Sequence, residues 1–456
     1  MSQSTLPSAD KLIKLLELRD FKTLRKTFKE AEQADIGEFL SEAPLDICVA
    51  LLRLVPRNRR SDLFSYIEEE RQVELVEELP DEIVTSFVNE MEPDNRTKLL
   101  ENVTTETRDQ ILQRLDPEEE SIARQLLSYP EDSVGRLMTP DFLALDPYMT
   151  VAEALESIRW KTSIPPEFLH YLFVTNTKGE LMGEVSLASL ILSDPANLPI
   201  SQVMKQTHVT LTPFQESGEA VELFRKYDRN YMPVVNDKGV LVGIVTADDV
   251  FDVAEEEATE DIQQFGGQAV LEYSYFQTPI LTMVRKRVGW LAVLFLSGFL
   301  SGHAIRNYED TFSQWSFLMF FLPMIIAAGG NSGTQSASLV IRGMALNEIS
   351  TQDAWRVFCR EMAVGLLLGL CLASIGYFLP SIWGLDPRIG IVISMSLVCV
   401  VIFGVLSGSM LPFLFRALKL DPAVVSSPFI STLVDLSGIL ILFNIFLLMM
   451  KFVPFQ

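Results

Sequence analysis

One acidic residue lies deep inside an apolar stretch close to the end of the sequence. Asp435 is about twelve residues into the run 423–450, which contains no Lys or Arg to act as a counter-ion. A lone carboxylate at membrane depth is costly and usually faces a pathway or a partner. Hydroxyls such as those of Thr432 and Ser437 offer one way to satisfy it. We favour the other interpretation, in which Asp435 binds a cation in a pore and a two-fold dimer brings two copies together.

A second apolar stretch contains the polar run "GGNSGTQ" at 329–335. Small residues of this kind allow membrane helices to pack closely. Alternatively, a broken or polar-lined helix faces a water-filled pathway, because irregular backbone at membrane depth is tolerated only there or inside protein. Adjacent glycines and Gln335 in the same turn favour this second interpretation. We therefore predict that Asn331 and Thr432 join Asp435 along the pore.

The third feature is a dense run of carboxylates ahead of the apolar half. Eight acidic residues fall within 248–261, and no Lys or Arg occurs between Lys238 and Arg285. In a helix these like charges recur at i,i+3 and i,i+4, where they repel one another. The segment therefore requires cations as counter-charges. Its carboxylates are Asp248, Asp249, Asp252, Glu255, Glu256, Glu257, Glu260 and Asp261.

Composition separates the 456-residue chain into an acidic part and an apolar part. Residues 1–284 hold 26 basic and 52 acidic residues, whereas residues 285–456 hold 11 and 8. A strongly acidic part disfavours nucleic acid, because phosphate binding needs a basic face, and it favours cations. Enzyme chemistry is not indicated either, since the histidines show no metal-ligand spacing and no nucleophile–base pairing. These histidines are His170, His208 and His303.

Five long apolar stretches follow Arg287, and each reaches the ~20 residues needed to cross a bilayer as a helix. With the N-terminus inside, eight basic residues flank the inner ends of these stretches and three flank the outer ends. The positive-inside rule then predicts a cytoplasmic N-terminus and an outside C-terminus. No apolar signal core precedes the acidic part, so no secretory peptide is expected. The stretches are 288–305, 315–341, 362–383, 389–415 and 423–450.

The acidic part contains two kinds of repeat. Residues 1–130 read as short amphipathic helices with breakers about every 12–13 residues from Pro80, which predicts a superhelix of stacked units. Residues 131–256 contain two copies of one pattern, read as strand, helix, strand, Lys-Gly turn, strand and helix. The aligned segments are 135–159 with 201–225, and 172–191 with 232–251.

This second repeat resembles a tandem pair of CBS domains, modules that often bind adenine nucleotides. The Gly-x-x-Thr-x-x-Asp element of that family is matched by Gly243, Thr246 and Asp249 in the second copy. In the family pattern the hydroxyl and the acid contact phosphate and ribose. The first copy has Ser189 where an acid is expected. Two interpretations therefore stay open, an ATP site at the CBS pair and a purely structural fold repeat.

Taken in this order, the parts resemble the MgtE family of magnesium channels and transporters. The specific motifs are "YPEDSVGRLMTP" (129–140), "GGNSGTQSASLVIRGMA" (329–345) and "DPAVVSSPFISTLVDLSG" (421–438). The resemblance implies a multidomain membrane protein with an α-helical superhelical N domain, a tandem CBS (α+β) pair, a connecting plug helix and a five-helix all-α transmembrane domain. The expected bounds are 1–130 for the N domain, 131–196 and 197–256 for the CBS domains, 257–284 for the plug helix and 285–456 for the pore domain.

The resemblance also implies a function. It predicts a homodimer that moves Mg²⁺ past Asp435 into the cytoplasm, in the inner membrane of a prokaryote, with Mn²⁺ and Co²⁺ as alternative ions. Mg²⁺ bound between the cytoplasmic domains and the plug helix would close it, because carboxylates that converge only in the closed state give that state the higher affinity. The rival interpretation is a membrane-anchored nucleotide or metal sensor without transport. The predicted regulatory ligands are Asp248, Asp249, Asp252, Glu255, Glu256, Glu260, Glu90 and Asp94.

Overall fold

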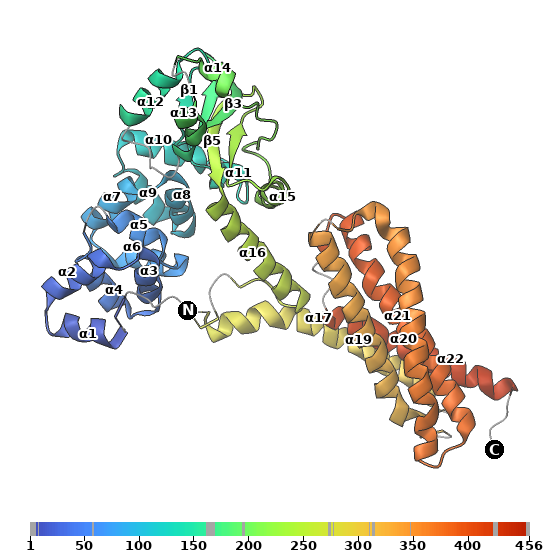
Figure 1. The fold of residues 1–456 in the computed structure, drawn as a ribbon. Coiled ribbons are helices and arrows are strands. Elements are labelled where there is room, and N and C mark those ends of the chain that lie inside the picture. The colour runs from blue at the N-terminus through green and yellow to red at the C-terminus, as the bar shows by residue number, and fades with distance from the viewer. Residues whose placement is uncertain are drawn as a thin grey trace. The chain divides into compact units, whose positions relative to one another are not determined.

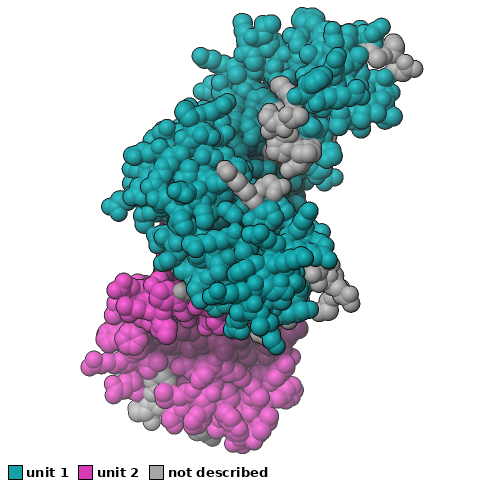
Figure 2. All heavy atoms as spheres, turned by 90° about the vertical axis from the view of Figure 1, so that its left-hand side faces the viewer, with its two compact units in different colours: residues 1–255 teal, residues 256–456 magenta. Residues whose placement is uncertain are grey.

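The structure is a computed structural model of the whole chain. It divides into two compact units, residues 1–255 and residues 256–456, called unit 1 and unit 2 below and coloured teal and magenta in Figure 2. The described residues are 6–7, 9–56, 59–160, 169–193, 197–271, 275–276, 278–309, 311, 315–346, 348–422 and 427–452.

Unit 1 begins with a series of short helices, drawn in blue to cyan in Figure 1. Most of them begin at positions that differ by multiples of 12 residues, namely 9, 21, 33, 45, 69, 81, 93, 105 and 117. The predicted helical repeat is therefore confirmed, and it extends further toward the N-terminus than Pro80. The helices are α1 (Ala9–Glu17), α2 (Phe21–Glu30), α3 (Gln33–Glu42), α4 (Leu45–Leu52), α5 (Arg60–Ser65), α6 (Glu69–Glu78), α7 (Asp81–Glu90), α8 (Pro93–Asn102), α9 (Thr105–Leu112) and α10 (Pro117–Leu126).

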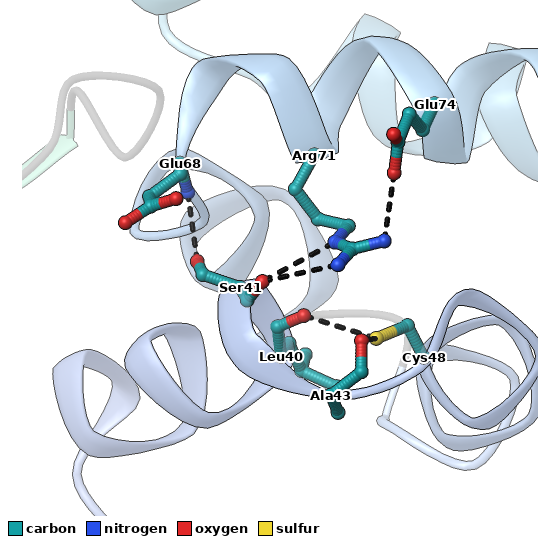
Figure 3. A network of polar contacts seen from close by, with 7 residues as sticks. All are labelled: Leu40, Ser41, Ala43, Cys48, Glu68, Arg71 and Glu74. Carbon is teal, nitrogen blue, oxygen red and sulfur yellow. Dashed lines mark hydrogen bonds and ion pairs between the residues drawn. The ribbon is translucent and has the colours of Figure 1, made fainter. Parts of the chain in front are cut away.

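Each of these helices contributes apolar side chains to one continuous core, and polar contacts close the joints between them. Figure 3 shows the joint at the end of α3, where helix carbonyls lack intrahelical donors. The Cys48 thiol donates to the carbonyl of Leu40 at 3.0 Å, and the Arg71 guanidinium donates to that of Ser41 at 3.2 and 3.3 Å. Burial raises the pKa of the Cys48 thiol to about 11, which keeps it a donor.

The second half of unit 1 is built from two small β-sheets. In the first sheet β1 pairs parallel with β2, and β2 pairs antiparallel with β3. In the second, β4 pairs antiparallel with β5, and Leu211 bridges β4 in parallel, as β1 does in the first copy. Both Lys-Gly turns have the positive φ that glycine favours, 78° at Gly179 and 75° at Gly239. The two-copy pattern read from the sequence is thus confirmed.

The elements of this half fall in the order that the repeat predicts. They are α11 (Val134–Leu137), β1 (Ala144–Leu145), α12 (Val151–Trp160), β2 (Tyr171–Thr175), β3 (Leu181–Ser186), α13 (Leu187–Leu192), α14 (Ile200–Val203), α15 (Ser217–Tyr227), β4 (Tyr231–Val235) and β5 (Leu241–Thr246).

The connecting helix differs from its predicted position at 257–284. Helix α16 spans Ala247–Phe265 and follows directly from β5, so it includes the whole acidic run. It ends at Gly266, and Gly267 has a φ of 75° that favours glycine. A Cβ at Gly267 would lie 2.9 Å from the Trp290 ring. The helix thus begins ten residues before the predicted start at 257, and the two acidic residues in its first turn, Asp248 and Asp249, favour that start.

Unit 2 consists of long helices, namely α17 (Ile280–Arg306), α19 (Leu318–Ala345), α20 (Ala354–Ile382), α21 (Pro387–Ala417) and α22 (Ser427–Phe452), with a 3₁₀ turn (Thr351–Asp353) before α20. Within the described residues, four segments are long and apolar enough to cross a membrane, those of α17, α20, α21 and α22. Helix α19 is long enough, but the polar run 329–335 lowers its mean hydropathy. Its apolar residues nevertheless pack into the core of unit 2. That α19 is the fifth membrane span therefore stays a prediction.

Helix α19 is continuous through the polar run, which corrects the prediction of a broken helix. Its glycines instead allow close packing against α21. A Cβ at Gly404 would lie 2.2 Å from the carbonyl oxygen of Gly329, and one at Gly408 would lie 2.0 Å from that of Gly333. The close-packing interpretation therefore accounts for these glycines. Asn331 and Gln335 are exposed on this helix, so the polar-lined interpretation applies to them alone.

Candidate cation sites

The first candidate site is built on the N-terminus of α8. Asp94 is in the first turn of this helix, where the helix dipole favours negative charge. The fully buried Arg96 fixes α8, because its guanidinium pairs with Glu119 of α10 and donates to the carbonyl of Val88 in α7 at 3.2 Å. The backbone that carries Asp94 is thus held by α7, which precedes α8 in the chain, and by α10, which comes after it.

The Asp94 carboxylate lacks the partners that a buried charge requires. The residue is 8% exposed, and its Oδ1 atom is buried without a hydrogen bond. Burial raises its pKa to about 7, the charges of Glu92 and Asp248 add to this effect, and backbone N–H groups of Asn95 and Asp94 oppose it. A buried carboxylate in this position either holds a proton or needs a cation.

Helix α16 brings further carboxylates to the same place. Burial raises the pKa of Asp249 well above its ordinary value, and the charges of Asp94, Asp248 and Asp252 raise it further. The hydroxyl of Thr246 donates to Asp249 Oδ2 at 2.6 Å and partly offsets this effect. The predicted residues Asp94, Asp248 and Asp249 therefore influence one another electrostatically, although 154 positions separate the first two in the sequence.

A single lysine lies next to this group. The Lys98 ammonium of α8 is 2.6 Å from Glu69 Oε1 of α6 and 3.9 Å from Asp252 Oδ2 of α16. The Asp252 side chain is 72% exposed, so screening by water weakens the longer of these two pairs. Lys98 thus links α6, α8 and the start of α16 through charge, and it was missed because single lysines carry no recognisable spacing.

Unit 1 contains a cleft of about 1820 Å³. Five of the predicted acids line it, namely Glu90, Asp94, Asp248, Asp249 and Asp252. Glu255 is close enough to Asp252 for its charge to raise the pKa of that residue. Within the part of the chain that the structure describes, no three His, Cys, Asp or Glu side chains are close enough together to form a complete metal site. Mutual repulsion explains this spacing, and Mg²⁺ is commonly held by one or two carboxylates and several waters.

The remaining predicted acids, Glu256 and Glu260, are on the part of α16 that belongs to unit 2. In this part of α16, one charge interaction involves a residue outside the predicted set. Burial raises the pKa of Asp261, and the next largest cause is the charge of Asp421, followed by that of Glu260. Asp421 is in the connection between α21 and α22, and although it opens the motif 421–438, nothing in the sequence predicted that it lies near α16. A pairing between residues 160 positions apart leaves no local signal.

The candidate pore residues are on α22 and α19. Asp435 is half-buried in α22, and among the described residues its carboxylate has no hydrogen-bond or ion-pair partner. The Thr432 hydroxyl donates to the carbonyl of Pro428 at 2.9 Å, not to Asp435. The structure therefore does not show the alternative in which the Thr432 hydroxyl satisfies the Asp435 carboxylate. Thr432 and Asp435 are three residues apart in a helix and thus share one face.

Helices α19 and α22 are in direct contact beside this face. Thr334 and Ser427 share a hydrogen bond of 3.2 Å, and Gly329 packs against Val434. Asn331 is exposed, and among the described residues no hydrogen bond joins it to Asp435. A further acid was missed at the edge of the span, since the Ser336 hydroxyl of α19 donates to Glu361 Oε2 of α20 at 2.7 Å.

The candidate nucleotide residues have mostly structural roles in this fold. A Cβ at Gly243 would lie 2.9 Å from the carbonyl oxygen of Thr139, so this glycine allows the neighbouring segment to pair with β5. Thr246 and Asp249 are hydrogen-bonded to each other and face the acidic cleft. In the first copy the hydroxyls of Ser186 and Ser189 are 2.7 Å apart in place of this pair.

Comparison with known proteins decides what these sites belong to. A profile described as a divalent cation transporter (MgtE) matches residues 322–445, one described as the MgtE intracellular N domain matches 31–132, and the CBS domain profile matches 134–194 and 200–256. The magnesium transporter MgtE of Thermus thermophilus is 38% identical over 317 residues, 70% of each chain. The chain belongs to the MgtE family. The Bacillus subtilis magnesium transporter MgtE is 33% identical over 311 residues, 68% of each chain.

A solved MgtE-family structure agrees with the fold of unit 1. It is described as the cytosolic domain of the Mg²⁺ channel MgtE in complex with ATP, and it is 30% identical to this chain with a TM-score of 0.51. It covers 54% of this chain and is covered completely. The predicted family and architecture are thus confirmed, with the number of membrane helices left at four plus the candidate α19.

Proposed function

We propose that this MgtE-family protein is a Mg²⁺ channel or transporter that moves the ion into the cytoplasm past Asp435. The observation that carries the proposal is a half-buried carboxylate on an apolar helix, without a hydrogen-bond or ion-pair partner among the described residues. Such a group is costly in a membrane and needs a cation or a partner. Three relatives are named magnesium transporters, which supports Mg²⁺ as that cation.

The proposal includes a homodimer, because one carboxylate is a thin site for a divalent ion. A two-fold axis beside α22 would place two Asp435 carboxylates and two Thr432 hydroxyls around one ion. Such a site holds a largely hydrated Mg²⁺, which loses its waters reluctantly, and still releases it. Light scattering of the detergent-solubilised protein should give the mass of two chains, and a monomer mass with intact transport would contradict this part.

The N-terminus is proposed to be cytoplasmic and the C-terminus outside, which requires α19 to be the fifth span. The excess of basic residues on the inner flanks supports this orientation. A cysteine introduced at Lys451 should react with a membrane-impermeant maleimide added to intact cells. Reaction only after permeabilisation would place the C-terminus inside and leave four spans.

Closure by cytoplasmic Mg²⁺ is the second half of the proposal. The charge of Asp248 raises the pKa of both Asp94 and Asp249, and the charge of Asp94 raises that of Asp249 further, which means that the three charges are unfavourable together while no cation is bound. A divalent ion that bridges them removes this cost and therefore favours whichever conformation brings them together. The transported ion then acts as the signal that limits its own entry.

Transport itself is tested in liposomes that contain a fluorescent Mg²⁺ indicator. The wild-type protein should admit Mg²⁺, and Asp435→Asn should abolish the flux. Asp386→Asn is a matched control, because Asp386 caps α21 by accepting from the backbone of Arg388, and Asn caps a helix equally well. Wild-type flux through Asp435→Asn would remove the pore assignment. A wild-type protein that folds but admits no ion would favour the rival sensor without transport.

A nucleotide at the CBS pair is a separate proposal, supported by the ATP complex of the solved relative. In this chain Thr246 and Asp249 match the Gly-x-x-Thr-x-x-Asp element of nucleotide-binding CBS domains. Asp249 also belongs to the acidic group, by which we mean Asp94, Asp248 and Asp249. Nucleotide and Mg²⁺ would therefore depend on the same side chain. Calorimetry with ATP should show binding that Thr246→Ala weakens, and no heat with the wild-type protein would leave the repeat a purely structural one.

A further inference from the structure

The charge of unit 1 is distributed unevenly along the chain. The first 30 residues hold seven basic and four acidic residues, whereas residues 31–284 hold 19 basic and 48 acidic residues. The basic excess therefore falls on α1, α2 and the turn between them, at the N-terminal end of a helical series that is otherwise strongly acidic. The basic residues are Lys11, Lys14, Arg19, Lys22, Arg25, Lys26 and Lys29.

Helices α1 and α2 direct these charges to the solvent. Leu12, Leu24 and Phe28 are buried in the core of the helical series, and all seven basic side chains are exposed. Two exposed apolar side chains lie beside these charges, Leu18 in the turn between the helices at 69% exposure and Phe21 at the start of α2 at 43%. We call this surface, made of the seven basic residues with Leu18 and Phe21, the basic face.

We propose that the basic face docks on anionic lipid headgroups of the bilayer that the same chain spans. Helices that carry Lys and Arg on one face, with apolar side chains nearby, bind at the lipid interface. The cytoplasmic leaflet is negatively charged, so it attracts this face and repels the acidic remainder of unit 1. The apolar helices of unit 2 guarantee that such a surface is always tethered to the same molecule.

Two features of the basic face fit lipid better than a folded partner. Its charges are spread over two helices and have few fixed partners, as shown by Lys26, whose pair with Glu30 is 3.9 Å long with both side chains largely exposed. Leu18 is exposed in the turn between the helices and Phe21 at the first position of α2. A fluid headgroup layer can accommodate such a surface, and each basic residue that reaches it favours the docked state roughly five-fold.

The test uses the full-length protein in nanodiscs of stated composition. Cys359, Cys371 and Cys399 are replaced by Ala, and an environment-sensitive dye is attached to Leu18→Cys. In discs with about one-third phosphatidylglycerol we expect a blue-shifted emission that spin-labelled lipids quench. In phosphatidylcholine discs, or in high salt, both effects should be lost. The same dye at Leu192→Cys, a leucine of unit 1 that is 82% exposed, should respond in neither disc.

Two charge-reversal variants decide whether the basic face causes the docking. Lys22→Glu with Arg25→Glu should lower the ratio of docked to undocked protein by at least ~25-fold. Lys178→Glu with Lys238→Glu changes the charge equally at exposed turns and should leave docking intact. The proposal is overturned if Leu18→Cys is not quenched in anionic discs, or if both double variants behave alike. A shift that occurs without anionic lipid and grows with protein concentration would assign the face to a second copy of the chain instead.

Discussion

Replacing Asp94 by Asn tests the acidic group at its most buried member. The pKa of Asp94 is raised from 3.8 to about 7, chiefly by burial, so folding places this carboxylate where its charge is disfavoured. The rise corresponds to about 4 kcal/mol, an upper limit for what one buried carboxylate removes from the stability of unit 1 at pH 8.

The direction of the pH dependence follows from the raised pKa. Below pH 3.8 both the folded and the unfolded state hold the proton, so Asp94 then costs nothing. As the pH rises toward about 7 the unfolded state releases the proton first, and stability falls. Asp94→Asn cannot ionise, so it should be more stable than the wild type at pH 8 by up to about 4 kcal/mol, or about 10 °C in melting temperature.

Mg²⁺ should narrow the difference in stability between the two proteins. An ion bound by Asp94 and its neighbours stabilises the wild type by about 2.7 kcal/mol when its concentration is 100 times its dissociation constant. The variant lacks one ligand and should gain much less. Mg²⁺ binding to the wild type should also strengthen as the pH rises through about 7, because proton and ion compete for Asp94.

The assay is thermal unfolding of the full-length protein in detergent from pH 5 to pH 8.5, with a chelator or with Mg²⁺. Asp109→Asn is the matched control, since Asp109 is an exposed acid on α9 in the same helical series. It should follow the wild type under every condition. Equal pH profiles for wild type and Asp94→Asn, or equal stabilisation of both by Mg²⁺, would refute the assignment of Asp94 to a cation site.

Two other changes probe the neighbourhood of the sites. Lys98→Met removes the ammonium that lies 2.6 Å from Glu69 and 3.9 Å from Asp252, so calorimetry should show Mg²⁺ bound several-fold more tightly; unchanged or weaker binding would mean that Lys98 does not compete with the ion. Gly408→Ala places a Cβ 2.0 Å from the carbonyl oxygen of Gly333, so α19 and α21 must separate, at a cost of about 1–3 kcal/mol or more. Detergent stability equal to that of the wild type would show that the two helices are not in such close contact.

The sequence predicted those features that depend on local or periodic patterns. Apolar runs, the two-copy strand pattern and the twelve-residue helical spacing each leave a periodic signal, and the structure has all three. Asp435 was also recognisable, because an acid inside an apolar run stands out without any knowledge of the fold. The connecting helix was expected from residue 257, after the second CBS copy, but it begins at Ala247, where the helix dipole favours Asp248 and Asp249 in its first turn.

Long-range pairings were beyond the sequence. Asp421 lies near the end of α16, Glu361 accepts a hydrogen bond from Ser336 on another helix, and Lys98 links three helices. Nothing in the sequence shows which residues these three side chains meet. The glycines of α19 were interpreted as a break because the partner glycines of α21, 75 positions further on, were not recognised. Packing of one helix against another decides such cases, and a single sequence does not reveal which helices meet.

Recording from membrane patches while Mg²⁺ is varied on the cytoplasmic side tests the central claim most directly, because it measures conduction and closure together. The account predicts a Mg²⁺ current in the wild type that falls steeply as cytoplasmic Mg²⁺ rises through the millimolar range. A variant with Asp94→Asn, Asp248→Asn and Asp249→Asn should conduct equally well but stay open at those concentrations. Wild-type closure in the triple variant would contradict the role of the acidic group, and the absence of any Mg²⁺ current in the wild type would contradict the account as a whole.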